Sequence, residues 1–316
     1  IGEAISPSHY HYWHTTGTVG AFGAAVAAGV ILKLDAERMV WALGSAGTQA
    51  SGLWEFLIDG AMSKQLHPAK AAVNGLLAAL LAHKGFTAAT RILEGEKGFI
   101  RATAPEFNLD RITDGLERGM THYRIQGVSF KIHASCRHTH PAIDAALALV
   151  KQHNLLPEDV EAVKALVYSG AMDLLGKVEV TSPFSAKFSM PYCLATAIVH
   201  RDAGLSRFTE AALANSQTRA LMQRVTLEVD PELDRLYPQK WAQSVEIRTR
   251  SGKLFRLQVD FPKGDPENPL TPGELRAKFY ALTMPFLPRQ AIDRYVDRIA
   301  HLDELPDMND FVRPAS

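Results

Sequence analysis

Histidines and lysines gather in three short segments of the chain, and these residue types can move protons and bind anions. Nine of the twelve histidines come before Pro141. The first segment, Ser8–Thr18, reads SHYHYWHTTGT and places His14 just before a glycine-rich apolar run. A histidine beside hydroxyl groups at a helix entry can exchange a proton with an anion held by the helix N–H groups. Surface or capping histidines are the alternative interpretation.

The second segment, SKQLHPAK, contains Lys64 and His67 and leads directly into an apolar run. Two lysines and a histidine at a helix start are unusual, because the helix macrodipole favours negative groups there. An anionic ligand bound at that end would explain them. The alternative is a basic turn that is simply solvated.

The third segment, FKIHASCRHTH, contains Lys131, Cys136, Arg137 and His140. The Cys-x-His-x-His pattern in it lacks the spacing of a structural zinc site and a fourth ligand nearby, so we predict no metal. Cys136 could be a nucleophile, although a basic group that gathers substrate carboxylates fits the helix-start context better. Further on, Tyr192 ends the run SPFSAKFSMPY, and a tyrosine in such a place is more often a core residue than a catalytic one.

Apolar, small-residue helices must position the first two segments. We expect helices over Val19–Leu32 and Ala71–His83, and a third that Asp35 caps and that runs to about Ala46. The helix over Ala71–His83 is apolar on nearly every face, which predicts a place in the middle of a helical domain. The 18 uncharged residues Thr15–Leu32 are rich in glycine, so we interpret them as a buried helix and not as a membrane span.

The pattern changes near Ser129, from where strands alternate with helices. Strands are expected over 159–169, 225–230, 244–250 and 254–260, the last two joined by a hairpin turn at Ser251–Gly252. Helices are expected over 141–154, 191–202, 272–282 and 288–301, with Thr271 as an N-cap after a proline-rich connector. The predicted fold is mainly α with an α+β domain: a helical domain (1–127), an α+β lid domain (128–264) and a C-terminal helical return (265–316).

Composition narrows the function classes. The chain has 34 Lys+Arg and 34 Asp+Glu, and this balance argues against a protein whose main partner is nucleic acid. Its two cysteines cannot form a disulfide framework or an iron–sulfur site, so we expect reduced thiols in a cytoplasmic protein. The first residue is Ile1 and not Met, from which we expect a cut or processed chain.

Several segments in collinear order carry a resemblance to a known family. They are HTTGTVGAFGAA from His14, ALGSAGTQASGL from Ala42, the Lys64–His67 run, ILEG from Ile92, Lys131–His140, SPF from Ser182, and PKGDP from Pro262. Together they resemble the MmgE/PrpD family, which includes 2-methylcitrate dehydratases, cis-aconitate decarboxylases and iminodisuccinate epimerases. Family members carry well over a hundred further residues before the segment that begins at Ile1, with more active-site positions in them.

The resemblance implies a helical domain with an α+β lid, a homodimer, and a site without metal or cofactor. Active-site positions of the decarboxylase branch match His14, Lys64, Lys131 and Tyr192, which we take as catalytic candidates. A histidine of that branch falls at Cys136 here. Cys136 is therefore a substrate-binding candidate, and the remaining candidates of this kind are His67, Arg137 and His140.

The family chemistries share one step, the movement of a proton at carbon next to a carboxylate. Such a step needs fixed positive charge to stabilise an enolate-like state, which the lysines and Arg137 would supply, and a proton shuttle such as His14. We therefore predict a cofactor-independent lyase, in the first place a dehydratase, acting on a small di- or tricarboxylate. An epimerase on a similar acid and an inactive binding or assembly subunit are the alternatives.

Overall fold

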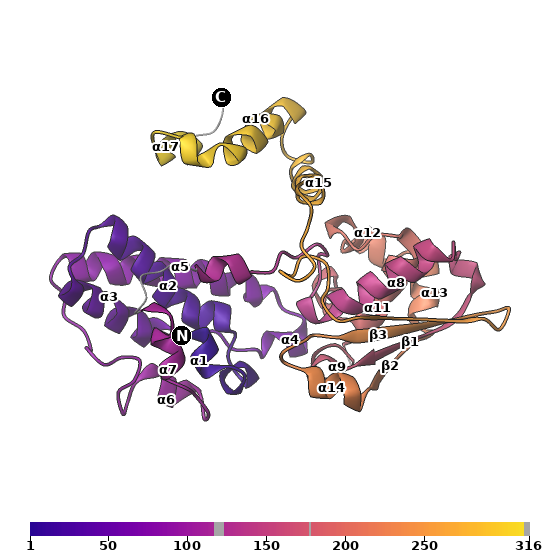
Figure 1. Cartoon of the computed structure of the whole chain (residues 1–316), viewed down its shortest axis with the longest axis horizontal. Coiled ribbons are helices and arrows are strands. Elements are labelled where there is room, and N and C mark those ends of the chain that lie inside the picture. The colour runs from indigo at the N-terminus through magenta and orange to yellow at the C-terminus, as the bar shows by residue number, and fades with distance from the viewer. Residues whose placement is uncertain (117–122, 177, 313–316) are drawn as a thin grey trace. The chain divides into compact units, whose positions relative to one another are not determined.

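The computed structural model describes residues 1–116, 123–176 and 178–312, which belong to two compact units. Unit 1 comprises Ile1–Tyr123, and unit 2 comprises Arg124–Ser316 (Figure 1). The described elements of unit 1 are helical, whereas unit 2 combines helices with a four-stranded sheet. The fold is therefore mainly α with an α+β part, as the sequence predicts. The predicted domain limits at 127/128 and 264/265 stay predictions.

Two long helices form the centre of unit 1. They run parallel, because α2 residues Gly17, Gly20 and Ala24 approach the α5 residues His67, Ala71 and Gly75 in the same order. The described helices of unit 1 are α1 (Gly2–Ile5), α2 (Thr15–Ile31), α3 (Ala36–Gln49), α4 (Phe56–Asp59), α5 (Leu66–His83), α6 (Phe99–Thr103) and α7 (Asp110–Thr113).

Small residues let α2 and α5 approach closely. A Cβ atom at Gly75 would lie 2.5 Å from the Cβ of Ala24 and 2.6 Å from the Ala21 carbonyl oxygen, distances that no real side chain tolerates. At the other end of the pair, a Cβ at Gly17 would lie 3.2 Å from the Cβ of His67. The close approach therefore brings the N-termini of α2 and α5 together.

Helix α5 lies between α2 and α3, as its apolar sequence predicts, but one of its faces is exposed and is not covered by described residues. Its small residues, among them Ala78, Ala79 and Ala82, face the core and are fully buried. Its larger residues lie on the other side, where Val73 is 63 % and Leu76 50 % exposed. The core face of α5 is thus selected by close backbone packing and not by side-chain size.

The sheet of unit 2 has the strand order β2-β1-β3-β4. Strand β1 pairs with β2 in parallel and with β3 antiparallel, and β3 and β4 form the predicted hairpin around Ser251–Gly252. Most residues of β3 and the second half of β1 are buried, including Ala165, Val167 and Val245. The strands are β1 (Val160–Val167), β2 (Val225–Val229), β3 (Gln243–Thr249) and β4 (Leu254–Val259).

Helices lie on both sides of this sheet. Figure 1 shows α8, α11 and α13 on one side of the strands, and α9 and α14 on the other. Helix α8 begins at His140, the last residue of the third basic segment, so its packing on β3 and β4 fixes the end of that segment. The helices before the connector are α8 (His140–Gln152), α9 (Ser169–Leu175), α10 (Pro183–Ala186), α11 (Met190–His200), α12 (Glu210–Leu213), α13 (Ser216–Met222) and α14 (Pro231–Leu236).

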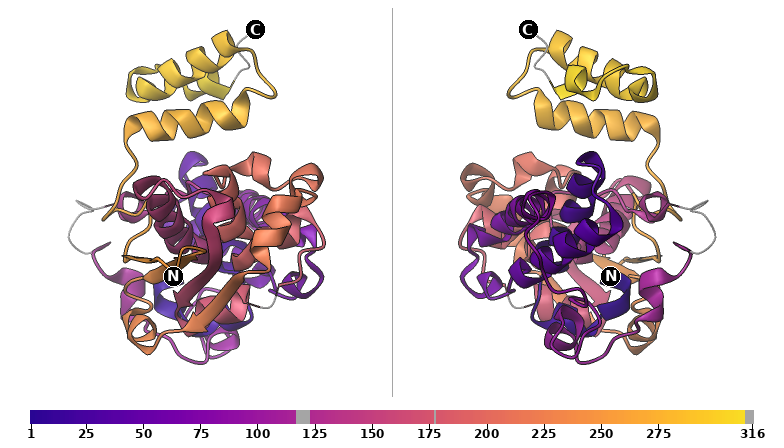
Figure 2. Two further views of the ribbon diagram at one scale, coloured as in Figure 1. Left: turned by 90° about the vertical axis from the view of Figure 1, so that its right-hand side faces the viewer. Right: turned by 90° about the vertical axis from the view of Figure 1, so that its left-hand side faces the viewer.

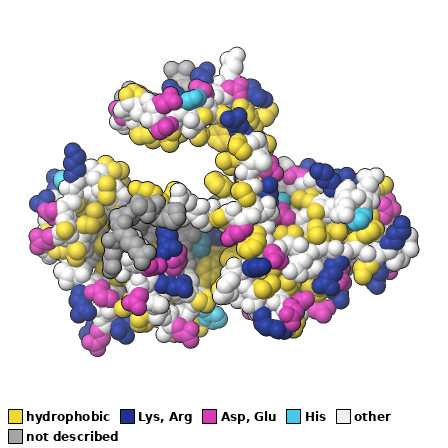
Figure 3. Space-filling view, in the orientation of Figure 1, with side chains coloured by type: hydrophobic (Ala, Val, Ile, Leu, Met, Phe, Trp, Pro, Cys, Tyr) yellow, Lys and Arg dark blue, Asp and Glu magenta, His cyan; other side chains and the backbone are white. Residues whose placement is uncertain are grey.

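Three helices follow the proline-rich connector: α15 (Pro272–Thr283), α16 (Arg289–Ala300) and α17 (Met308–Val312). Thr271 caps α15 in a capping box with Glu274, as the sequence predicts. Helices α15 and α16 lie side by side (Figure 2) and are joined by a hydrogen bond from Tyr280 to Asp293. Apolar side chains are exposed over this segment (Figure 3), and Phe286 is 82 % exposed.

The predicted elements agree with the observed ones to within a few residues, apart from the starts of two helices. Helix α2 begins at Thr15 and α5 at Leu66, four and five residues before the expected starts. Both helices therefore begin inside the basic segments, beside His14 and His67. Among the described residues, all helices are too short or too polar to cross a membrane.

Candidate active site

His14 and His67 form a hydrogen-bonded pair in unit 1, with 2.9 Å between their Nδ1 atoms. His14 is the N-cap residue of α2, and its backbone N–H donates to the Gly52 carbonyl oxygen at 2.9 Å. His67 lies in the first turn of α5. The close packing of α2 and α5 thus joins the first two basic segments at their histidines.

The contact between two Nδ1 atoms fixes the protonation of the pair. One Nδ1 must carry a proton and the other must accept it, so the accepting ring in its neutral form carries its own proton on Nε2. Two fully protonated rings would lose this hydrogen bond and repel each other. The pair therefore shares a single proton between its Nδ1 atoms.

Aromatic rings and Lys64 surround the histidine pair. The Trp54 ring lies 4.7 Å from the His14 ring, and the Phe56 ring lies 5.6 Å from the His67 ring, measured between centroids. The Lys64 ammonium is 5.8 Å from the centre of a Trp54 ring. Burial, and after it the positive charge of Lys64, lower the pKa of His67. His67 is thereby kept neutral and able to accept a proton at neutral pH.

In unit 2 the third basic segment forms a loop that leads into α8. The Lys131 ammonium turns back and donates to the Ser135 carbonyl oxygen at 3.2 Å, although the residue as a whole is exposed. Burial of the ammonium lowers the pKa of Lys131, and the charge of Arg137 acts in the same direction. Arg137 is ion-paired with Asp265 of the connector. Lys131 and Arg137 therefore lie close together as two cations.

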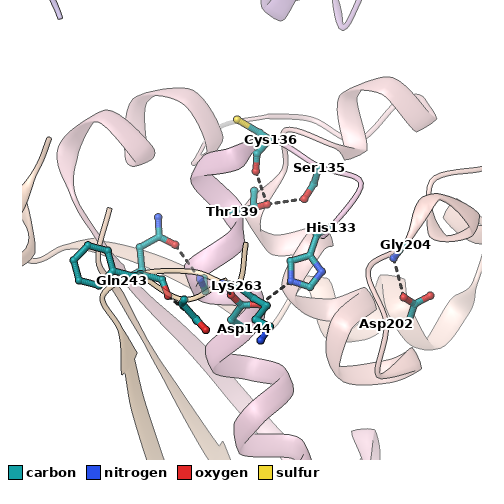
Figure 4. A network of polar contacts seen from close by, with 12 residues as sticks. His133, Ser135, Cys136, Thr139, Asp144, Asp202, Gly204, Gln243 and Lys263 are labelled. Atoms are coloured by element: carbon teal, nitrogen blue, oxygen red, sulfur yellow. Dashed lines mark hydrogen bonds and ion pairs between the residues drawn. The ribbon is translucent and has the colours of Figure 1, made fainter. Parts of the chain in front are cut away.

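Asp144 of α8 ties this loop to the connector, as Figure 4 shows. One carboxylate oxygen lies 2.8 Å from His133 Nε2, and the other accepts the backbone N–H of Lys263 at 2.6 Å. The loop is closed further by the Thr139 hydroxyl, which donates to the Cys136 carbonyl oxygen at 2.7 Å. These bonds hold Lys131 and Arg137 in place from the buried side of the loop.

His140 lies behind the loop and is fully buried. Its ring stands edge-on to His133 at 5.0 Å, and neither of its nitrogens makes a hydrogen bond to a described residue. Burial in the first place, and the neighbouring His133 next, hold the pKa of His140 well below the usual value. The structure thus places His140 as a neutral ring without access to solvent.

Tyr192 lies in the core of unit 2 and is 1 % exposed. Its hydroxyl donates to the Arg207 carbonyl oxygen at 2.6 Å, and burial raises its pKa. The adjacent Cys193 is also buried, with a thiol pKa raised to about 12, whereas Cys136 is partly exposed. The structure thus directs the Tyr192 hydroxyl into the core, while the predicted role of Tyr192 as an acid stays a prediction.

The eight candidates therefore fall into separate groups. His14, Lys64 and His67 come together in unit 1, and Lys131, Cys136 and Arg137 share one loop in unit 2. Sequence reasoning missed Trp54, Trp241 and Asp265, although Asp265 stands in the quoted PKGDP run. Within the described part of the chain, no three His, Cys, Asp or Glu side chains are grouped so that they could hold a metal ion.

The chain thus combines a helical unit that contains a hydrogen-bonded histidine pair with an α+β unit that contains a basic loop. Comparison with known families identifies the class of protein to which this combination belongs. The MmgE/PrpD N-terminal domain matches residues 1–112, and the MmgE/PrpD C-terminal domain matches residues 133–302. The chain belongs to the MmgE/PrpD family.

Curated relatives of the chain include proteins named cis-aconitate decarboxylase. The chain is 27 % identical over 330 residues to the cis-aconitate decarboxylase of Aspergillus terreus, covering 98 % of this chain and 66 % of that protein. It is 25 % identical to the cis-aconitate decarboxylases of Mus musculus and Homo sapiens, over 95 % and 93 % of this chain and 62 % and 61 % of theirs. The chain spans about two thirds of the length of these relatives.

Proposed function

We propose that the protein is a lyase that acts on a small tricarboxylic acid by moving a proton at carbon next to a carboxylate, without a cofactor. The observation that carries the proposal is the His14–His67 hydrogen bond beside Lys64. The names of the relatives make decarboxylation of an unsaturated tricarboxylate such as cis-aconitate the first reaction to test. Dehydration of a related hydroxy acid uses the same groups and is the second.

Decarboxylation needs a fixed cation and one proton. When the C–C bond to a carboxylate breaks, CO₂ leaves and the bonding electron pair stays on carbon, delocalised toward the remaining acid. Lys64 would stabilise that negative charge. His14 would then deliver a proton to the carbon, which completes a C–H bond in place of the lost C–C bond.

His67 would return the proton that His14 gives up. In the arrangement in which His67 is the donor, the proton of the shared bond lies on His67 Nδ1 and the proton of His14 lies on Nε2. As His14 gives its Nε2 proton to the substrate, it accepts the Nδ1 proton of His67. His67 is partly exposed, so its own Nε2 can take a proton from solvent as its Nδ1 proton moves across. One proton thus enters at His67 and one leaves at His14, with both rings neutral before and after.

The remaining candidates take supporting roles in the proposal. Lys131, Arg137 and Cys136 would contact substrate carboxylates on unit 2, and Tyr192 would position substrate or act as a second acid after releasing Arg207. His140 would shape the loop. We also propose a homodimer and a cytoplasmic location.

Incubation of the protein with cis-aconitate in D₂O distinguishes the reactions. Release of CO₂ with one deuterium fixed on carbon supports the decarboxylase, and gain or loss of water supports the dehydratase. With a chiral di- or tricarboxylate in place of cis-aconitate, deuterium exchange at the α-carbon with inversion and without loss of CO₂ or water would replace the lyase by an epimerase. No turnover of any di- or tricarboxylate would favour an inactive binding subunit.

Substitutions test the histidine pair. We expect His14→Gln to lower kcat by about a hundredfold or more, the usual contribution of a general acid. His67→Gln should lower kcat by about tenfold and change the pH profile, because a glutamine can hold the His14 ring but cannot relay a proton. His83→Gln, at the exposed end of α5, is the matched control and should leave kcat unchanged. Full activity of His14→Gln would remove the histidine pair from the mechanism.

A further inference from the structure

Trp54 in unit 1 lies next to both the histidine pair and Lys64. Its ring is 4.7 Å from the His14 ring, measured between centroids, and the Lys64 ammonium is 5.8 Å from the centre of a Trp54 ring. At these distances an aromatic ring attracts a neighbouring ring and a cation. One side chain therefore interacts with the proton donor and with the fixed cation of the proposed reaction.

The backbone segment that carries Trp54 also contacts both histidines. The Trp54 N–H donates to the Tyr12 carbonyl oxygen at 3.2 Å, and the Gly52 carbonyl oxygen accepts the His14 N–H at 2.9 Å. Gly52 has a φ of 147°, and a Cβ atom there would lie 3.3 Å from His67 Nδ1. The segment is thus packed against His67 on one side and bonded to His14 on the other.

Two further aromatic rings pack on the indole of Trp54. Tyr10 stands edge-on to it at 4.8 Å, and the Phe56 ring lies 5.6 Å away. Phe56 is buried and is also 5.6 Å from the His67 ring. The indole is therefore held in one place before any substrate binds.

The indole N–H contributes nothing to this packing. Trp54 Nε1 is buried and makes no hydrogen bond to any described residue. A buried N–H without an acceptor costs stability, a cost that a phenylalanine would not have. Tryptophan attracts cations more strongly than phenylalanine or tyrosine, so the face of the ring is the property that explains an indole here.

The place of Lys64 matters because its charge reaches His67. The titratable groups that act on His67 are His14, through the hydrogen bond, and Lys64, whose positive charge adds to burial in lowering the pKa of His67. Removal of the Trp54 ring would take away one attraction that holds the ammonium there. It would leave a flexible stem whose ammonium is strongly hydrated.

We propose that Trp54 is the positioning residue of this site: its ring face holds the Lys64 ammonium near His67, and its contact with His14 keeps the two Nδ1 atoms within hydrogen-bond distance. The inference rests on the proposed function for what these positions do in a reaction. The positions themselves can be measured without turnover.

NMR spectra of the imidazole groups in ¹⁵N-labelled protein test the inference without substrate. In the wild type we expect a coupling between the two Nδ1 nuclei across their hydrogen bond. In Trp54→Leu this coupling should be lost and the pKa of His67 should rise toward its ordinary value, because the ring and the nearby charge are gone. In Trp54→Phe, which keeps a ring, both should stay close to those of the wild type.

Kinetics with cis-aconitate add a second measurement. Trp54→Leu should lower kcat by about ten- to a hundredfold and change KM much less, because a displaced Lys64 loses contact with charge that develops in the transition state. Trp54→Phe should keep kcat within about threefold of the wild type. Phe86→Leu, an exposed aromatic position beyond the C-terminal end of α5, is the matched control and should change neither the spectra nor kcat.

Lys64→Met separates the two contacts of the ring and covers the case in which Trp54→Leu does not fold. It keeps the indole, so the coupling between the Nδ1 nuclei should remain while the pKa of His67 rises. Loss of the coupling in Lys64→Met would overturn the proposal. Wild-type spectra in Trp54→Leu would do the same, as would equal damage in Trp54→Phe or Phe86→Leu.

This proposal and the proposed function fail separately. If the spectra change as expected but no acid is converted, Trp54 still positions the site and the proposed reaction is lost. If cis-aconitate is converted and Trp54→Leu keeps both the kcat and the spectra of the wild type, the reaction stands and the role of Trp54 is lost.

Discussion

The two units hold their candidate groups by different physical means. In unit 1, His14 and His67 meet because two helices pack so closely that glycine is required between them. In unit 2, Lys131 and Arg137 lie on a loop held by polar side chains, chiefly Asp265 and Asp144. One arrangement depends on shape and the other on charge.

This difference sets how each arrangement should respond to change. Close helix packing excludes added volume but is insensitive to salt or pH. Ion pairs and buried titratable groups accept small changes of volume but depend on charge state. A volume change should therefore damage unit 1 most, and a charge change should damage unit 2 most.

The largest expected effect is that of Gly75→Ala. The new Cβ would lie within 2.6 Å of atoms of Ala21, Ala24 and Ala25, so α5 must move away from α2. We expect a loss of about 3 kcal/mol in the free energy of unfolding, as for other overpacked cores. Urea unfolding followed by circular dichroism measures the loss, and hydrogen exchange should locate it in α2 and α5.

Gly23→Ala is the matched control on α2. Its Cβ would meet nothing within 4 Å, so the better helix propensity of alanine should stabilise the protein by about 0.5–1 kcal/mol. Opposite signs for the two variants would establish that close approach, and not helix propensity, positions the histidine pair. Equal effects would contradict the shape-based account of unit 1.

A smaller effect is expected when the charge of Asp265 is removed. Asp265→Asn leaves Arg137 without its counter-ion while both side chains are largely buried, at 15 % and 13 % exposure. We expect a loss of about 2 kcal/mol, less than for a fully buried pair because some water reaches it. Glu228→Gln, which breaks an exposed pair with Lys164, should cost at most about 0.5 kcal/mol. A cost for Asp265→Asn no larger than this control would show that charge does not hold the loop.

Helix caps and the hairpin turn could be predicted from the sequence, whereas contacts between residues far apart in the chain could not. The Asp35 and Thr271 caps and the Ser251–Gly252 hairpin follow from residues a few positions apart, and all are present. His14 and His67 are 53 positions apart, and their contact depends on which faces of α2 and α5 pack. Hydrophobicity does not predict which face of α5 is buried. Alanine and glycine form its core face, whereas its valine and most of its leucines are exposed.

Unit 2 shows the same limit for charged residues. The basic character of the 130–140 segment was visible in the sequence, but the partner of Arg137 lies 128 positions away in the connector. For His140, the residue type favoured ligand binding, which stays a prediction, whereas the burial that lowers its pKa was not predicted. Burial follows from the packing of α8 on the sheet, which residue type alone does not reveal.

The smallest and most specific expected effect is a pH dependence that His140 gives to unit 2. The pKa of His140 is lowered on folding, so below about pH 6.5 the unfolded chain binds a proton that the folded chain does not. The stability that its neutral form contributes is complete above that pH and falls by up to about 1.4 kcal/mol per pH unit as the pH drops toward the folded pKa.

In His140→Leu this part of the slope should vanish between pH 6.5 and 5, measured by urea unfolding at each pH. His153→Gln, at the exposed C-terminal end of α8, reports any general effect of losing a histidine. An undiminished slope in His140→Leu would mean that another group makes unit 2 sensitive to acid, and the contrast between a shape-held and a charge-held unit would have to rest on Asp265 alone.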